Sequence, residues 1–389
     1  MTVRLPRLPR LPRLAHLSAP APGVPVGRRL LFVERRRATL TVLGVATSLL
    51  LVLVLGGIFA GAVEQVTRYI RTSPADIFIS QAGVRTMHMS ASALGPETVS
   101  AAAAVPGVAW AAPIGFASGS IAGPQGRQLT YLIGYDTDTG RGGARLVDGR
   151  TPGPGEAVLD EEAAEQLRVS LGSRVTVMGT PLRVVGLSAG GTSITNTTTF
   201  VDRAEFERIH SDQTSYVLVR ADDDRDPAAV AAGLRTALPE ATVQTREEFA
   251  ASEARVVTDM SADLLRLMST IGLLIALAVI ALGLMGATLS RMRDFAVLKA
   301  LGSTTPRLVG AVVVQVLWTI TLAVGVAVAA ALALGWLIPL AAPTVQIAVT
   351  VPAAARTTAL ALLIGLAAAV WPLRRIASID AATAFRETR

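Results

Sequence analysis

The sequence contains no cysteine among its 389 residues. Disulfide bonds, thiolate nucleophiles and metal sites built from cysteine are therefore excluded. Lysine is nearly absent as well, because Lys299 is the single one, and Ala300 follows it. A phosphate-binding loop of the GxxxxGKS or GxxxxGKT type needs Ser or Thr after its lysine. The chain therefore has no nucleotide-hydrolysing loop of this kind.

Histidine is also scarce, and none of His16, His88 and His210 forms a pair with metal-ligand spacing. Met87-His88-Met89 offers ligand types that suit copper(I), but we interpret it as a surface or core loop. Asp222–Asp226 resembles a calcium loop, yet it lacks the twelve-residue EF-hand pattern, so we interpret it as a solvated turn. We find no catalytic constellation. The sequence predicts a non-catalytic protein without metal or cofactor sites.

Charge is missing from three long stretches, 38–63, 267–290 and 308–355. About 20 apolar residues cross a hydrocarbon core of roughly 30 Å. The last stretch is too long for one helix and has prolines near its centre, so we divide it at an outer loop, 338–352. The sequence thus predicts four transmembrane helices, at 38–63, 267–290, 308–337 and 353–373.

Positive charge lies beside these stretches. Residues 1–37 carry nine Arg and one Glu, and 291–307 carries four basic residues and one acid, whereas 64–266 carries 18 Arg against 25 Asp and Glu. Basic loops stay in the cytoplasm. We therefore predict a protein of the cell membrane with both termini, 1–37 and 374–389, in the cytoplasm and 64–266 outside. This distribution disfavours nucleic acid as a partner. The repeated Leu-Pro-Arg near the start predicts a disordered basic tail.

The outer segment, 64–266, has the composition of a folded domain. Alternating or β-branched residues predict strands at 75–80, 127–134, 174–178, 182–187 and 215–219. Helical patterns cover 96–105, 161–167 and 227–238. The predicted fold is an α-helical membrane protein with four transmembrane helices and a large α+β extracytoplasmic domain, in two subdomains, between the first and second helices. Charges at helical spacing over 246–265 predict a helix that continues into the second span, as a rigid mechanical link.

Glycines lie at helical spacing in two of the predicted spans. Gly57 and Gly61 form GxxxG in the first span, and Gly283 and Gly286 place small residues on one side of the second. Such residues allow helices to approach closely, as in a dimer. Glycine is common in membrane helices in general, so a packing seam and an incidental occurrence remain equal alternatives.

The short segment 291–307 predicts a cytoplasmic helix with one apolar edge. Phe295, Leu298 and Leu301 recur at i, i+3 and i+6, and Gly302 suits the C-cap. Such a helix could lie on the lipid surface. Its short length and sharp ends favour insertion into a socket on a soluble protein.

Residues 293–302, RDFAVLKALG, resemble the coupling helix of the FtsX/MacB-type ABC transporter permeases, in which Glu is usual at the position of Asp294. The closing segment, 371–386, is similar to the family's, although Ala381 stands where Pro is typical and Phe385 where Leu is typical. The family's periplasmic core domain is similar to this chain at 134–136, 146–149, 156–160 and 184–187.

Residues 69–77 resemble the DevC-like branch of stand-alone permease subunits. The family resemblance implies a non-catalytic subunit that binds a separate ABC ATPase and a second permease chain, which we expect to form a homodimer in the bilayer. A periplasmic adaptor is a further partner. Nucleotide-driven closure of the ATPase would move the outer domains by mechanotransmission, for efflux of a hydrophobic or lipid-like substrate. The resemblance assigns the ATPase contact to Asp294, Phe295, Leu298, Lys299, Leu301 and Gly302.

A second function within the same family is signal transmission. FtsX-like members pass the ATPase stroke to an extracytoplasmic cell-wall hydrolase and move no substrate. Their outer domains are usually smaller than 64–266, which favours transport here.

Overall fold

The computed structural model describes residues 35–193, 196–290, 304–342 and 345–377. They belong to two compact units. The first unit contains the described residues of 1–45, 277–322 and 362–389, and the second contains those of 46–276 and 323–361.

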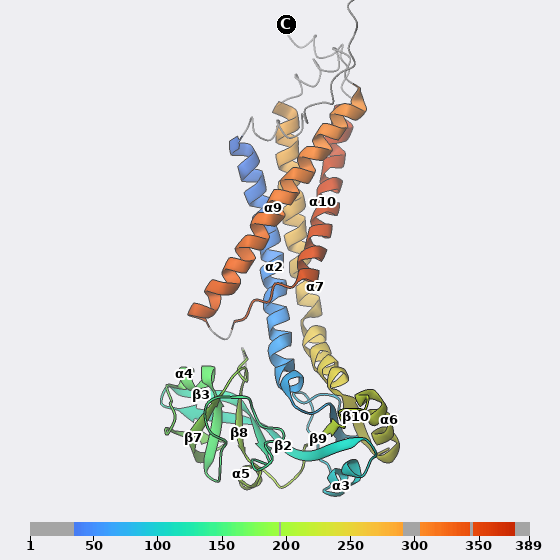
Figure 1. Ribbon diagram of the computed structural model, residues 1–389. Helices are drawn as coiled ribbons and strands as arrows, with labels where there is room; N and C mark the ends of the chain where they lie inside the picture. Colours follow the sequence, from blue (N-terminus) through green and yellow to red (C-terminus); the bar gives the residue numbers. More distant parts are fainter. Residues whose placement is uncertain (1–34, 194–195, 291–303, 343–344, 378–389) are drawn as a thin grey trace, which may run out of the picture. The chain divides into compact units, whose positions relative to one another are not determined.

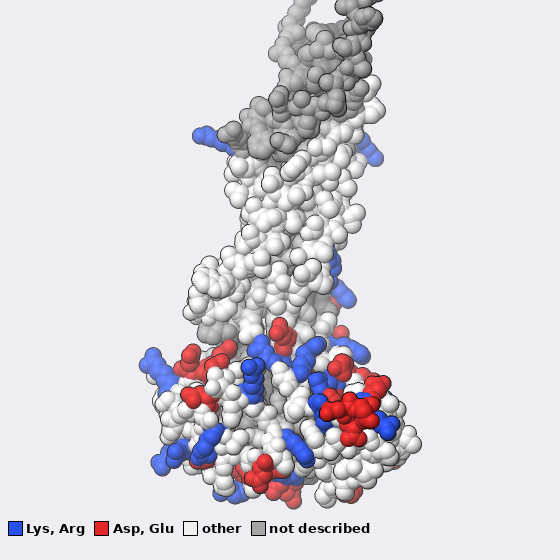
Figure 2. Space-filling view, viewed as in Figure 1, with Lys and Arg blue, Asp and Glu red and all other residues white. Residues whose placement is uncertain are grey.

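Four helices in the described part of the chain are long and apolar enough to cross a membrane (Figure 1). They are α2 (Arg35–Thr72), α7 (Arg246–Ser290), α9 (Thr305–Ala341) and α10 (Val351–Ala377). The predicted number of apolar helices is confirmed. On the face shown in Figure 2, charged side chains gather over the domain between α2 and α7, and the apolar helices are nearly free of them.

Two of these helices extend beyond the uncharged stretches. α2 continues to Thr72 although charge begins at Glu64, because no helix breaker occurs before Pro74. α7 begins at Arg246 and runs without a break to Ser290, which confirms the predicted continuous helix. The predicted bounds 38–63 and 267–290 therefore describe only the apolar portions of longer helices.

The outer domain is built on a ten-stranded sheet. Its strands are β1 (Ile77–Gln81), β2 (Val108–Gly123), β3 (Gly126–Tyr135), β4 (Leu146–Gly149), β5 (Glu156–Asp160), β6 (Arg174–Val177), β7 (Thr180–Ser188), β8 (Thr197–Asp202), β9 (Tyr216–Ala221) and β10 (Ala241–Thr245). Their order is β10-β1-β9-β2-β3-β8-β5-β7-β4, and β6 pairs with β2 and β7. The pairs β3–β8 and β5–β7 are parallel, and the others are antiparallel.

The long strand β2 connects two lobes. Its first half, 108–114, pairs with β9, and its second half, 115–123, pairs with β3. The β9 lobe carries the helices α3 (Glu97–Ala103) and α6 (Pro227–Ala237), and the β3 lobe carries α4 (Glu161–Leu167) and α5 (Arg203–Ile209). One apolar cluster fills each lobe, and a third, which includes Phe78 and Phe200, spans both lobes, so the division into two subdomains stays a prediction.

A pair of glycines fixes the packing of α5 on the sheet. Gly115 and Gly134 are opposite each other in the β2–β3 register. A Cβ atom at either glycine would lie 2.3 or 2.2 Å from the side chain of Phe206, which is buried. The two glycines therefore leave the space that this ring fills. β2 is rich in Ala and Gly because its neighbours supply the bulk, and for this reason its sequence lacks the β-branched pattern of a strand.

Candidate functional site

The predicted ATPase contact lies outside the described residues. This applies to all six positions, Asp294, Phe295, Leu298, Lys299, Leu301 and Gly302. Their assignment stays a prediction. The structure describes the region where the long helices meet the outer domain.

In the second unit, the glycine face of α2 is covered by an extended segment that precedes α10. A Cβ at Gly57 would lie 2.6 Å from Ile347 Cγ2, and one at Gly61 would lie 2.2 Å from Gln346 O. Ala348 N also donates to Gly57 O at 3.0 Å. Within this chain GxxxG thus packs against backbone of the outer loop, and its use between helices stays a prediction for the assembled dimer.

In the first unit, Gly283 and Gly286 differ. A Cβ at Gly283 would lie 2.7 Å from Thr41 Cγ2, so this glycine lets α7 and α2 approach closely. Gly286 has no heavy atom within 4 Å of its ideal Cβ position among the described residues. Gly283 thus faces α2 in the first unit, and helix-packing roles for Gly283 and Gly286 stay predictions.

The outer end of α2 is buried in the outer domain. Tyr69 donates its hydroxyl to Gly142 O at 3.0 Å, and its ring centroid lies 6.1 Å from that of Phe200. Ile70 is fully buried and belongs to the same apolar cluster as Phe78 of β1. Because the helix ends inside this core, a displacement of its outer end displaces the domain as well.

The start of α7 is fixed by a capping box. Thr245 Oγ1 accepts from Glu248 N at 3.2 Å, and Thr245 N donates to Glu248 Oε2 at 2.9 Å. This reciprocal pair occupies N–H groups that a helix start otherwise leaves free. Arg235 of α6 donates to the same carboxylate at 2.6 Å. The first turn of α7 is thus attached to the β9 lobe through exposed and buried contacts.

Asp76 and Arg246 join the ends of both long helices. Arg246 donates through Nη2 to Asp76 Oδ1, through Nε to Ala75 O at 2.8 Å, and through its backbone N to Asp76 O at 2.7 Å. Asp76 Oδ2 accepts from Ala221 N at 3.2 Å and lies 3.3 Å from Arg220 Nε. The side chains of Arg246 and Asp76 are 25% and 15% exposed. We call the ion-paired residues Asp76, Arg220 and Arg246 the junction.

A second contact of α7 holds the loop after β1. The Glu253 side chain is 1% exposed, and its Oε1 accepts from the backbone N of Met87 and from that of His88 at 3.2 Å. Its Oε2 lies 2.9 Å from His88 Nδ1. These donors compensate a carboxylate that would be costly to bury alone. Burial, followed by the charge of Glu253, raises the pKa of the Tyr131 and Tyr216 hydroxyls.

The contact with Glu253 also fixes the position of the cluster Met87-His88-Met89. Met87 is buried, Met89 is exposed, and one ring nitrogen of His88 is occupied by Glu253. In the described ranges, no three His, Cys, Asp or Glu side chains are grouped so that they could hold a metal ion. The cluster belongs to a loop that the buried carboxylate attaches to α7.

Two models of known protein families match the chain. The model of the MacB-like periplasmic core domain matches residues 38–237, more than half of the sequence. The model of the FtsX-like permease C-terminal region matches residues 266–381. The chain is an FtsX/MacB-type ABC transporter permease.

Relatives match this permease over most of their length. An uncharacterized ABC transporter permease of Mycobacterium bovis is 26% identical over 90% of this chain and 96% of its own. One of Mycobacterium tuberculosis is 27% identical over the same shares. Among solved structures, the periplasmic region of MacB from Actinobacillus actinomycetemcomitans aligns with a TM-score of 0.36 and 16% identity, over 46% of this chain and 92% of that one. The extracellular domain of the noncanonic ABC-type transporter YknZ from Gram-positive bacteria gives 0.35 and 16%, over 44% and 98%.

Family membership places the permease in the cell membrane as a non-catalytic subunit. It also implies an ABC ATPase as partner and a second permease chain. The sequence did not reveal the junction, because Asp76 and Arg246 are far apart along the chain. One local signal was present: Thr245 followed three residues later by Glu248 is the pattern of a capping box, and it indicates the start of α7.

Proposed function

We propose that the permease transmits the stroke of a separate ABC ATPase to its outer domain, and that this movement exports a hydrophobic or lipid-like substrate. The observation that carries the proposal is the pair of unbroken helices α2 and α7. α7 begins at Arg246 of the junction, and α2 ends at Thr72, where Tyr69 and Ile70 attach it to the outer domain. A helix held in this way behaves as a lever, since its end cannot move without the sheet. The absence of a nucleotide-binding loop from the sequence requires that the energy come from a partner.

The proposed orientation places both termini and residues 291–307 in the cytoplasm. The basic flanks of the apolar helices support it, because Lys and Arg favour the cytoplasmic side. On this orientation, Phe295, Leu298 and Leu301 enter a socket on the ATPase, with Asp294 and Lys299 at its rim. A homodimer would present two such helices to two ATPase subunits, and a periplasmic adaptor would bind the outer domains.

The test of this assignment is Leu298→Asp in the permease co-expressed with its ATPase and reconstituted in liposomes. A charge in an apolar socket is costly to desolvate, so we expect ATPase stimulation to fall to the level of the ATPase alone. Leu298→Met, which keeps the volume and the apolar character, should retain stimulation. Both variants should be inserted in the membrane to the same level as the wild type.

Two results would overturn the proposal. If Leu298→Asp forms the complex and stimulates the ATPase normally, Leu298 does not contact a socket on the ATPase. Stable co-purification of a cell-wall hydrolase, together with ATP hydrolysis that transfers no lipid, would assign the permease to the signal-transmitting branch instead.

A further inference from the structure

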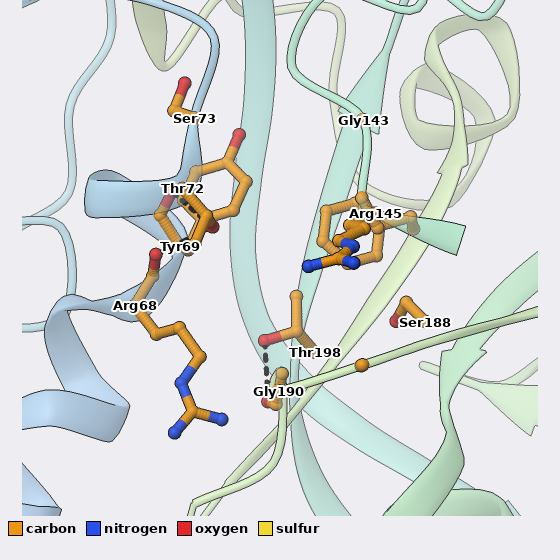
Figure 3. A pocket seen from close by; sticks show the side chains of 13 residues that line it. Arg68, Tyr69, Thr72, Ser73, Gly143, Arg145, Ser188, Gly190 and Thr198 are labelled. Carbon is orange, nitrogen blue, oxygen red and sulfur yellow. Dashed lines mark hydrogen bonds between the residues drawn. The ribbon is translucent and has the colours of Figure 1, made fainter. Parts of the chain in front are cut away.

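A pocket of about 240 Å³ lies beside the outer end of α2, within the second unit (Figure 3). Four segments form it: the last turns of α2, the loop that leads into β4, the loop after β7, and β8. Its volume is below the range of about 300–1,000 Å³ that is usual for drug-sized ligands. The pocket is therefore suited to a headgroup or a small anion, and too small for a complete lipid.

The lining of the pocket is cationic. Two arginines, Arg68 of α2 and Arg145 of the loop before β4, line it from different elements, and no Asp or Glu is among the lining residues. This is unusual for a segment, 64–266, in which acids outnumber arginines by 25 to 18. Arg145 is exposed and forms no ion pair within the part of the chain that the structure describes. Its guanidinium is free to donate to a ligand.

Arg68 is held in place before any ligand arrives. Its Nη2 donates to Gln346 Oε1 at 2.9 Å and lies 3.9 Å from Glu64 Oε1. The aliphatic part of the Arg68 side chain packs on Gly190, where a Cβ atom would lie 2.6 Å from Arg68 Cδ. The φ angle of Gly190 is +79°, so both the space and the backbone conformation require glycine at this position. A guanidinium fixed in this way loses little entropy when it binds an anion.

Two acids act on Arg68 from outside the lining, namely Glu64, whose Oε1 lies 3.9 Å from Arg68 Nη2, and Glu162. Burial and the neighbouring Asp160 raise the pKa of Glu162 to about 7, against a lowering by Arg68. Glu162 Oε2 is buried and has no hydrogen-bond partner among the described residues. Glu64 is 58% exposed, so solvent screens its attraction to Arg68, and the side chains that line the pocket keep a net positive charge from Arg68 and Arg145.

One wall of the pocket is apolar. The rings of Tyr69 and Phe200 lie next to each other, and Ala144 and Ala189 complete this side. Ser73, next to Tyr69 just after α2, and Thr198 of β8 add hydroxyl groups to the lining (Figure 3). A cationic rim beside an aromatic wall matches a ligand with a charged end and an apolar continuation.

The position along α2 places the pocket at the membrane surface. Val63 is the last residue of the uncharged stretch, and Arg68 follows five residues later, about 7.5 Å further along the helix. The headgroup layer extends about 5–8 Å beyond the hydrocarbon core on each side. Arg68 therefore lies at headgroup depth when Val63 is at the edge of the hydrocarbon core.

We infer that this pocket binds the anionic headgroup, a phosphate or a carboxylate, of an amphiphile in the outer leaflet. The inference deepens the proposed export function by naming the chemical class of the substrate, and it rests on that function for its physiological meaning. The binding itself requires neither ATP nor the ATPase.

The experiment measures binding of fluorescent phosphatidylglycerol and of fluorescent phosphatidylcholine to the full-length permease in detergent, without ATPase. We expect the anionic lipid to bind at least about tenfold more tightly. Loss of one charge-assisted hydrogen bond should weaken its binding about tenfold in Arg145→Gln. Arg145→Lys, which keeps the charge, should recover part of the affinity. Arg127→Gln, at an exposed arginine outside the lining, is the matched control and should bind as the wild type does.

Several outcomes overturn the inference. Equal binding of the two lipids would exclude recognition of the anionic headgroup, and unchanged binding by Arg145→Gln with an unchanged melting temperature would exclude the pocket. Competition by inorganic phosphate at the same concentration as the lipid would assign the site to a soluble anion. Because ATP is absent, loss of binding leaves the proposed export function standing, and normal binding with no ATP-driven transfer refutes only that function.

Discussion

Replacing Arg246 by Gln tests whether the junction transmits force or only stabilises the fold. The variant loses the ion pair with Asp76 and the hydrogen bond to Ala75 O, while Arg220 still lies beside the remaining carboxylate. Hydrogen bonds to charged groups contribute about 1.5–3 kcal/mol each, and removing one partner of a buried pair costs about 3–5 kcal/mol. Since the side chains of Arg246 and Asp76 are partly exposed, at 25% and 15%, we expect the free energy of unfolding to fall by about 2–3 kcal/mol.

A loss of this size is measurable as a shift in melting temperature. For domains of 150–250 residues, 1 kcal/mol corresponds to about 2–4 °C, so the outer domain of Arg246→Gln should melt about 4–12 °C below the wild type. Trp110 of β2, which lies 5.1 Å from the guanidinium of Arg141, supplies a fluorescence signal from this domain. Arg235→Gln is the matched control, because its ion pair with Glu248 is half exposed at the same helix start. Exposed pairs contribute about 0–1 kcal/mol, so this variant should melt close to the wild type.

A transport assay separates force transmission by the junction from stabilisation of the fold. In liposomes that contain the ATPase, we expect Arg246→Gln to hydrolyse ATP within about twofold of the wild-type rate. Lipid transfer should fall by about tenfold or more, because about 2 kcal/mol of lost linkage changes an equilibrium constant about 30-fold. Lower stability with an unchanged ratio of lipid moved to ATP hydrolysed would refute the lever, and would leave the junction a structural feature only.

Two further predictions concern the outer loop and pH. In Gly61→Val the new side chain cannot occupy the space of Gln346 O, so a cysteine introduced at Ala348 should react with a maleimide several-fold faster. The control is Gly56→Val, at a position with no atom within 4 Å, which should leave the reaction rate unchanged. Equal rates in the two variants would contradict the packing of the loop on Gly61. For Glu162, a pKa raised from 4.5 to about 7 means that the folded state binds the proton more tightly, so the cost of the buried charge is absent below pH 4.5 and complete above pH 7. The free energy of unfolding of Glu162→Gln should therefore equal that of the wild type at pH 4.5 and exceed it by about 1 kcal/mol at pH 8, after allowance for solvent access. A difference in melting temperature that stays constant across that pH range would contradict this prediction.

The parts of the fold that follow local rules were predictable from the sequence. Uncharged stretches identified the four apolar helices, because a run of this length without charge has few alternatives. The helix predicted at 161–167 has the observed bounds, since Asp160 caps it and its apolar residues recur at helical spacing. The motifs at 293–302 and 371–386 indicated the family that the comparisons show.

What the sequence could not reveal depends on contacts between distant residues. β2 was missed because Gly115 and Gly134 are small to accommodate Phe206, which comes from a helix far along the chain. The junction was missed for the same reason, since neither Asp76 nor Arg246 has a local pattern that identifies its partner. The end of α2 was placed too early, at 63, because hydropathy detects the membrane and not the helix that continues beyond it to Thr72.

Arg68 connects the two proposals through a single side chain. Its guanidinium donates to Gln346 of the outer loop and also lines the pocket, and the same loop covers Gly57 and Gly61 about two to three turns earlier on α2. An anion that takes donors of Arg68 competes with Gln346 for them, so occupancy of the pocket weakens one attachment of the loop that precedes α10. The loop and the pocket both contact α2, and Asp76 of the junction follows in the short segment between the end of α2 at Thr72 and β1. A stroke that moves this end would therefore act on the bound headgroup and on the outer domain in the same step.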